Sequence, residues 1–154
     1  MLNCFDVANY FIWLANSTGS FVSNLKLQKL VYYAQAWHLA LYGEPLFQED
    51  FEAWVHGPVI PNLYHEYKGF GWKPIQKDVE KKYIKDTFDE STLAFLEEVA
   101  EAYFSYDAYA LERMTHVESP WISARNGVSI DTLSCEVISK ESMKEYYSSR
   151  AEED

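Results

Sequence analysis

Residues 25–68 read LKLQKLVYYAQAWHLALYGEPLFQEDFEAWVHGPVIPNLYHEYK, and this stretch decides the fold. Its first part predicts a long helix, because apolar residues recur at the i, i+3, i+4 spacing of a helix face until Gly43 ends the pattern. The apolar stripe extends beyond one face, which is typical of a central, buried helix. We expect its rim to carry Lys26, Gln28 and Lys29.

The second part of this stretch predicts a strand and a turn. Residues 51–56 alternate apolar and polar side chains with period two, as in a half-buried strand. Gly57 and Pro58 are expected to end that strand. Pro61 suits the first turn of a short helix, where its missing N–H costs nothing.

The flanking sequence predicts further helices. Residues 5–15 have near-helical apolar spacing, and additional helices are expected after caps at Ser91 and Asp107, from Ser119 to Arg125, and from residue 139 or 140 to about 149. Residues 72–88 are the least apolar part and predict a surface excursion with one edge strand at 79–84. The fold class is therefore mainly α with a small β element, in a single compact domain over residues 1–150. Residues 151–154 form an acidic end that is expected to fray.

Composition and charge restrict the class of partner. The 154 residues include 17% aromatic residues, enough to bury a core, and carry a net charge of -11. This charge repels a phosphate backbone, so direct binding to nucleic acid is not expected. The acidity has two open interpretations, which are solubility alone and attraction to a basic protein partner.

Cysteine usage and hydropathy predict a cytoplasmic protein. Cys4 and Cys135 are the two cysteines and form no CxxC pair, so neither a disulfide framework nor a zinc site is expected. The N-terminal residues lack the basic region and the cleavage pattern of a signal peptide. No apolar stretch reaches the length of a membrane span, so no membrane association is expected.

Four blocks of sequence resemble one known family. They are KLQKLVYYAQAWHLALYGEPLF (26–47), FEAWVHGPVIPNLYHEY (51–67), LERMTHVESPWISAR (111–125) and ISKESMKEYY (138–147). In this order they resemble the Panacea domain, the SocA-like antitoxin group that includes phage-associated GepA-like proteins. The resemblance runs from about residue 25 to residue 147. It implies a mainly helical fold with a small antiparallel sheet, and a toxin, encoded by an adjacent gene, that the protein blocks or presents to a protease. Some relatives add a DNA-binding helix-turn-helix segment, and residues 1–24 supply no basic recognition helix.

Catalytic motifs are absent from the sequence. His56, His116 and Glu118 are the residue types of a metal or general-base site, but no pair of them has HExxH spacing. The phosphate-loop and nucleophile-elbow motifs are missing, and the surroundings of Cys135 are acidic. We therefore expect no catalytic residue, metal or cofactor. We assign a structural role to Gly57, Pro58, His116, Glu118, Pro120, Trp121 and Arg125.

Three functions remain as hypotheses. The first is a non-enzymatic, antitoxin-like protein that neutralises a cognate toxin through aromatic residues ringed by carboxylates. The second is an adaptor that delivers a client to an ATP-dependent protease, and the third is a small hydrolase built on His56, His116 and Glu118. The residues predicted to contact a partner are Tyr33, Trp37, His38, Trp54, His56, Tyr64 and Tyr67.

Overall fold

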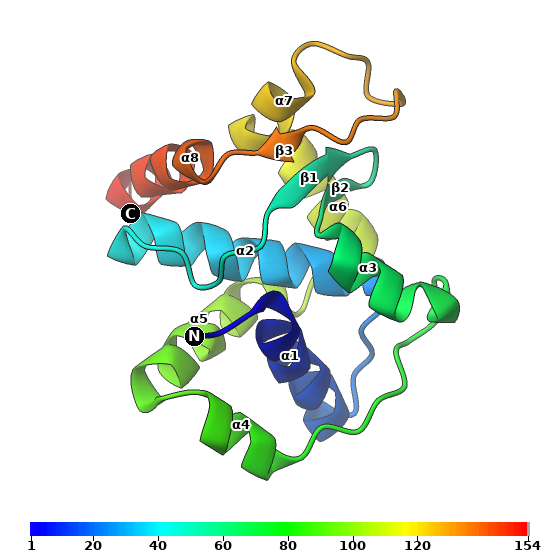
Figure 1. Cartoon of the computed structure of the whole chain (residues 1–154), viewed down its shortest axis with the longest axis vertical. Helices are drawn as coiled ribbons and strands as arrows, with labels where there is room; N and C mark the ends of the chain where they lie inside the picture. The colour runs from blue at the N-terminus through cyan, green and yellow to red at the C-terminus, as the bar shows by residue number, and fades with distance from the viewer. Residues whose placement is uncertain (154) are drawn as a thin grey trace.

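The computed structural model describes residues 1–153, with the side chains of residues 1–151. It confirms a mainly helical fold with a small antiparallel sheet (Figure 1). The helices are α1 (Cys4–Thr18), α2 (Asn24–Tyr42), α3 (Pro61–Tyr67), the 3-10 helix η1 (Lys68–Phe70), α4 (Lys81–Thr87), α5 (Glu90–Tyr103), α6 (Ala108–His116), α7 (Ser119–Arg125) and α8 (Lys140–Glu153). The strands are β1 (Phe51–Trp54), β2 (Gly57–Val59) and β3 (Val137–Ile138). Within the acidic end predicted to fray, α8 extends to Glu153, and Asp154 lies outside the described residues.

Helix α2 is the central element, as its apolar pattern predicted. The Ser23 hydroxyl accepts a hydrogen bond from the backbone N–H of Lys26 at 3.2 Å, and Gly43 ends the helix in the left-handed conformation with φ of 74°. Helices α1, α5, α6 and α8 all pack against it, with α8 alongside its C-terminal half (Figure 1). Its apolar face thereby forms the common floor of the hydrophobic core.

Polar side chains of α2 are buried as well, so the prediction that Gln28 and Lys29 lie on its rim is wrong. The Gln28 side-chain oxygen accepts a hydrogen bond from the Ile60 N–H at 3.0 Å, and the Gln35 amide bonds to the backbone of Leu46 and Phe47. These side-chain amides make the hydrogen bonds that water would otherwise make to the backbone of the loops folded over the helix. This explains why polar residues occur on a buried face of α2.

The sheet has the strand order β2-β1-β3, and both pairs are antiparallel (Figure 1). Phe51 pairs with Ile138, and Ala53 pairs with Pro58. The Phe51 ring meets the Tyr32 ring of α2 edge-on, with centroids 5.2 Å apart, so one face of the sheet packs on the core. Gly57 and Pro58 do not simply end the strand as predicted, because they begin its partner strand β2.

The prediction of an edge strand at 79–84 is wrong: residues 81–84 form the first part of helix α4, and residues 79–80 belong to neither a helix nor a strand. Ile84 and Phe88 lie four residues apart and are both buried, a helical spacing that the surrounding lysines obscured. Two predicted caps are also displaced. The side chain of Asp89, two residues before the expected cap Ser91, accepts the hydrogen bond from the Thr92 N–H at 2.7 Å, and Glu118 occupies the cap position of α7 in place of Ser119. The cap at Asp107 is confirmed.

Candidate partner-binding surfaces and buried polar clusters

The predicted contact residues differ in how far a partner can reach them. Tyr33 and Tyr67 are only 0% and 3% exposed, so they belong to the core and offer no surface in this structure. The other five residues are partly or fully exposed: Trp37, His38, Trp54, His56 and Tyr64. The structure does not gather these five into one patch.

The first surface surrounds the β1–β2 hairpin. The rings of Trp54 and Tyr64 meet edge-on with centroids 5.1 Å apart. His56, in the hairpin turn, places its Nδ1 2.8 Å from the Glu112 carboxylate of α6. The hairpin surface therefore displays two large rings next to a histidine that already has an acidic partner.

The second surface is an apolar groove between the C-terminal half of α2 and the length of α5, which we call the α2–α5 groove. It consists of two hollows of about 450 and 280 Å³ that share Phe95 in their walls. Its lining residues are Trp37, His38, Leu41, Tyr42, Glu44, Ser91, Thr92, Phe95, Glu98, Val99, Ala102, Tyr103 and Ala151. Leu41 and Tyr42 were not among the predicted contacts, although they are 50% and 58% exposed. The signal available in the sequence was their helical spacing, since residues 41 and 42 follow Trp37 and His38 by four positions.

Hydrogen bonds fix the walls of this groove. The Trp37 indole N–H donates to the Tyr103 hydroxyl at 2.7 Å, joining α2 to the end of α5. The His38 Nδ1 lies 2.6 Å from the Glu44 carbonyl oxygen, and the His38 ring meets the Phe95 ring edge-on. The aromatic walls are therefore held in place before any partner arrives.

A largely buried cluster of tyrosines around the Glu118 carboxylate adjoins the groove, because Tyr103 in the groove wall stacks on Tyr33. One Glu118 oxygen accepts hydrogen bonds from the hydroxyls of Tyr33 and Tyr147, each at 2.7 Å. The Tyr147 hydroxyl oxygen also lies 3.2 Å from the Tyr32 hydroxyl, and the Tyr33 ring stacks on Tyr103 with centroids 4.0 Å apart. Burial raises the pKa of the Glu118 carboxyl, whereas the two tyrosine hydrogen bonds act in the opposite direction. Through the Glu118 carboxylate this cluster joins α2 and α8 to the start of α7.

A second buried cluster lies beneath the hairpin. Lys29 is 0% exposed, and its Nζ donates to the Pro58 carbonyl oxygen at 3.3 Å. Burial lowers the pKa of the Lys29 amine to about 7, while attraction to the Glu112 carboxylate opposes the shift. A Cβ atom on Gly57 would lie 2.5 Å from Lys29 Cε. The hairpin therefore passes so close to the lysine side chain at residue 57 that only glycine fits. Its φ of 107° also favours glycine.

The predicted structural motif around α7 is an anchoring unit. The Trp121 indole N–H donates to the Trp54 carbonyl at 2.8 Å, and the His116 ring stacks on Trp121 with centroids 4.1 Å apart. Burial lowers the pKa of His116. The Arg125 guanidinium donates to the carbonyls of Ala53, Ser129 and Thr132, and so fastens the following loop to the sheet. The candidate hydrolase residues therefore serve separate contacts: His56 with Glu112, His116 with Trp121, and Glu118 with tyrosines.

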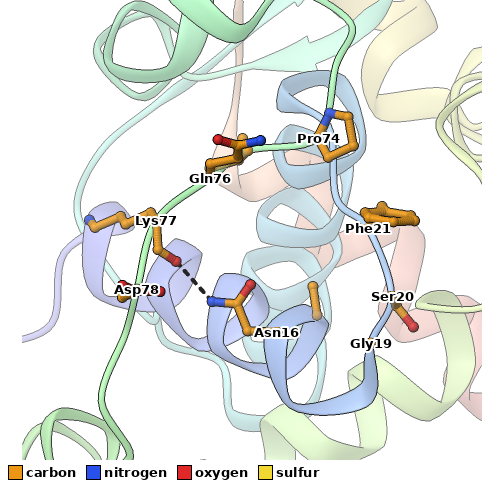
Figure 2. Close-up of a pocket in the computed structure, with 10 residues that line it drawn as sticks. Asn16, Gly19, Ser20, Phe21, Pro74, Gln76, Lys77 and Asp78 are labelled. Carbon is orange, nitrogen blue, oxygen red and sulfur yellow. Dashed lines mark hydrogen bonds between the residues drawn. The ribbon is translucent and has the colours of Figure 1, made fainter.

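A third hollow, of about 690 Å³, lies between the end of α1 and the strap at residues 74–78 (Figure 2). Figure 2 shows the Asn16 amide bonded to the Lys77 carbonyl, at 2.8 Å, with Phe21 and Pro74 on the walls. The Lys77 ammonium donates a hydrogen bond to the Asn9 side chain at 2.9 Å, and this bond holds the ammonium in place. Among the described side chains, none form a group of three His, Cys, Asp or Glu residues able to hold a metal ion. Over residues 1–153, the helices are too short or too polar to cross a membrane.

The model of one protein family matches residues 27–122, which is more than half of the chain. That family is described as "Antitoxin SocA-like, Panacea domain". The chain belongs to this family. The matched Panacea region runs from the first turns of α2 to Ile122 in α7, so it contains the hairpin surface, the α2–α5 groove up to Tyr103, and both Lys29 and Glu118.

A curated relative of this Panacea domain is the antitoxin SocA of Caulobacter vibrioides (strain NA1000 / CB15N), 41% identical over 78 residues. The aligned part covers 51% of this chain and 42% of the relative, so the chain spans less than half of the relative's length. No solved structure matches the chain. Arg125, the loop that it fastens and α8 lie beyond the part of the Panacea domain that the family model matches.

Proposed function

We propose that this protein is a non-enzymatic, antitoxin-like protein that neutralises a partner toxin by direct protein–protein binding. The observation that carries the proposal is membership of the Panacea family together with the identity of 41% to antitoxin SocA. The relative's name states its role, and the same role in this chain is the proposal. The partner would be the product of an adjacent gene.

The arrangement of charged and apolar groups supports binding to a protein. A net charge of -11 accelerates encounter with a basic protein, and exposed apolar residues such as Leu41 and Tyr42 then supply contacts that exclude water. The same charge repels nucleic acid. Because His56, His116 and Glu118 each have a different structural partner, the geometry supports no shared reaction centre for them.

Co-expression with the product of each adjacent gene tests the proposal. One of these products is expected to arrest growth alone and to be tolerated when this protein is present, and the two are expected to co-purify. Toxin half-life separates the two ways of neutralising it. An unchanged half-life with lost toxicity supports occlusion, whereas a shortened half-life that depends on an ATP-dependent protease supports the adaptor function. If no adjacent product is toxic and rescued, the proposed function is wrong.

A further inference from the structure

We infer that the α2–α5 groove is a docking site for a positively charged amphipathic helix of a partner protein. The identity of that partner as a toxin rests on the proposed function, but the groove and the chemistry that it accepts follow from the structure alone.

The shape of the groove suits a helix. Its lining positions on α5 are 91–92, 95, 98–99 and 102–103, which recur every three to four residues and so form one face of that helix. From residue 91 to residue 103 this face is roughly 18 Å long at 1.5 Å per residue. That length accepts about three turns of an incoming helix, with apolar anchors at i, i+4 and i+7.

The floor and walls of the groove are apolar and aromatic. Phe95 is buried at the junction of the two hollows, and both the His38 and Tyr42 rings meet it edge-on, at 5.4 and 5.8 Å between centroids. Leu41 leaves half of its surface exposed beside them. Exposed apolar area next to a preformed hollow is the feature that distinguishes a binding groove from scattered surface residues.

The charges around the groove determine the sign of the partner. Helix α5 carries the four carboxylates Glu90, Glu97, Glu98 and Glu101 and contains no lysine or arginine. Glu98 lines the first hollow and Glu44 lines the second. Arg150 lies near one end, where its guanidinium stacks over the Tyr146 ring at 5.2 Å. A partner helix flanked by lysine or arginine is therefore attracted along α5, whereas a second copy of this chain, with its charge of -11, is repelled.

Binding of a labelled peptide to the full chain tests the inference. The probe is an 18-residue helical peptide with leucines at i, i+4, i+7 and i+11 and lysines on its other face, compared with a peptide carrying glutamates in place of lysines. Fluorescence anisotropy is expected to show that the lysine peptide binds, that the glutamate peptide binds at least tenfold more weakly, and that added salt weakens the first complex.

Matched variants locate the binding. Leu41→Gln removes an apolar contact from the groove and is expected to lower the affinity for the lysine peptide at least tenfold. The control Leu133→Gln makes the same change at a residue that is 89% exposed in the loop after α7, and it is expected to leave that affinity unchanged. Ala102→Trp fills the groove from α5 and is expected to have the same effect as Leu41→Gln. Glu98→Gln is expected to weaken binding more than Glu66→Gln, which removes an equal charge from α3.

The inference would be overturned by equal affinity of the Leu41→Gln and Leu133→Gln variants, by equal affinity for both peptides, or by self-association of the wild type that Leu41→Gln abolishes. The last would assign the groove to a second copy. A toxin neutralised as well by Leu41→Gln and Ala102→Trp as by wild type would also overturn it while leaving the proposed function intact. If no toxin is neutralised at all, the proposed function fails. The peptide measurement still decides whether the groove binds a positively charged helix.

Discussion

Lys29 makes the stability of the folded protein depend on pH in a way that one substitution can isolate. The folded state loses the lysine proton near pH 7, because the pKa of the buried amine is about 7. The unfolded chain keeps that proton until the pH approaches the ordinary lysine pKa of 10.5. Between these values the unfolded state binds more protons, so the free energy of unfolding rises with pH. Below pH 7 both states are charged, and the cost of burying the ammonium is present in full.

The size of the effect follows from the two pKa values. Each pH unit over which only the unfolded state holds the proton contributes about 1.4 kcal/mol. Titration of the folded state is itself centred near pH 7, so the gain between pH 6 and pH 8.5 amounts to about 2 kcal/mol. Lys29→Met keeps a long apolar side chain in the same space and removes the titrating amine. The stability of wild type relative to this variant is therefore expected to increase by about 2 kcal/mol over that range.

Urea unfolding followed by circular dichroism at four values between pH 6 and pH 8.5 measures this difference. The other titrating groups are common to both proteins and cancel, and so does any constant cost of losing the hydrogen bond to the Pro58 carbonyl. Lys85→Met, at an exposed position of α4, controls for the loss of one positive charge. A difference between wild type and Lys29→Met that stays constant with pH would refute the argument, because the buried amine would then not titrate differently in the two states.

Three further substitutions test the anchoring contacts. Gly57→Ala places a Cβ 2.5 Å from the Lys29 side chain at φ of 107° and is expected to cost about 2 kcal/mol or more in urea unfolding, whereas Gly69→Ala, with no heavy atom within 4 Å, should cost far less. Glu118→Ala leaves two tyrosine hydroxyls without their acceptor and should cost about 1–3 kcal/mol, while Glu118→Gln keeps an acceptor and should retain most of the stability at pH 7; equal losses would contradict the proposed bonds. Arg125→Gln is expected to accelerate amide hydrogen exchange in residues 126–136 without affecting exchange in α1. Unchanged exchange in residues 126–136 would show that Arg125 does not hold this loop in place.

Much of the helical framework could be predicted from local patterns. The spacing of apolar residues located α2, and the predicted cap at Asp107 is present in the structure. The strand at β1 was predicted from alternation, but β2 was not, because its three residues contain both the glycine and the proline that normally mark a turn. Helix α4 was mistaken for a strand because Ile84 is the one buried residue among its seven, which gives too little apolar periodicity to identify a helix.

The candidate site was predicted only in part. Trp37 and His38 do line the α2–α5 groove, but Trp54, His56 and Tyr64 belong to the hairpin surface, and Tyr33 is buried. Tyrosine is equally common at core rims and at interfaces, so residue type does not separate the two. The groove itself requires α5 to lie beside α2, a contact between segments that are distant in the chain.

By itself the sequence determined the helical class, the family, the central position of α2 and the strongly negative charge, because each of these depends on composition or on neighbours within a few residues. Only the tertiary structure decided that Lys29 is enclosed by a hairpin about 30 residues away. It also decided that Glu118 meets Tyr33 across 85 positions of sequence. Burial and hydrogen-bond partners are set by which distant segments pack together, and local periodicity contains no record of that packing.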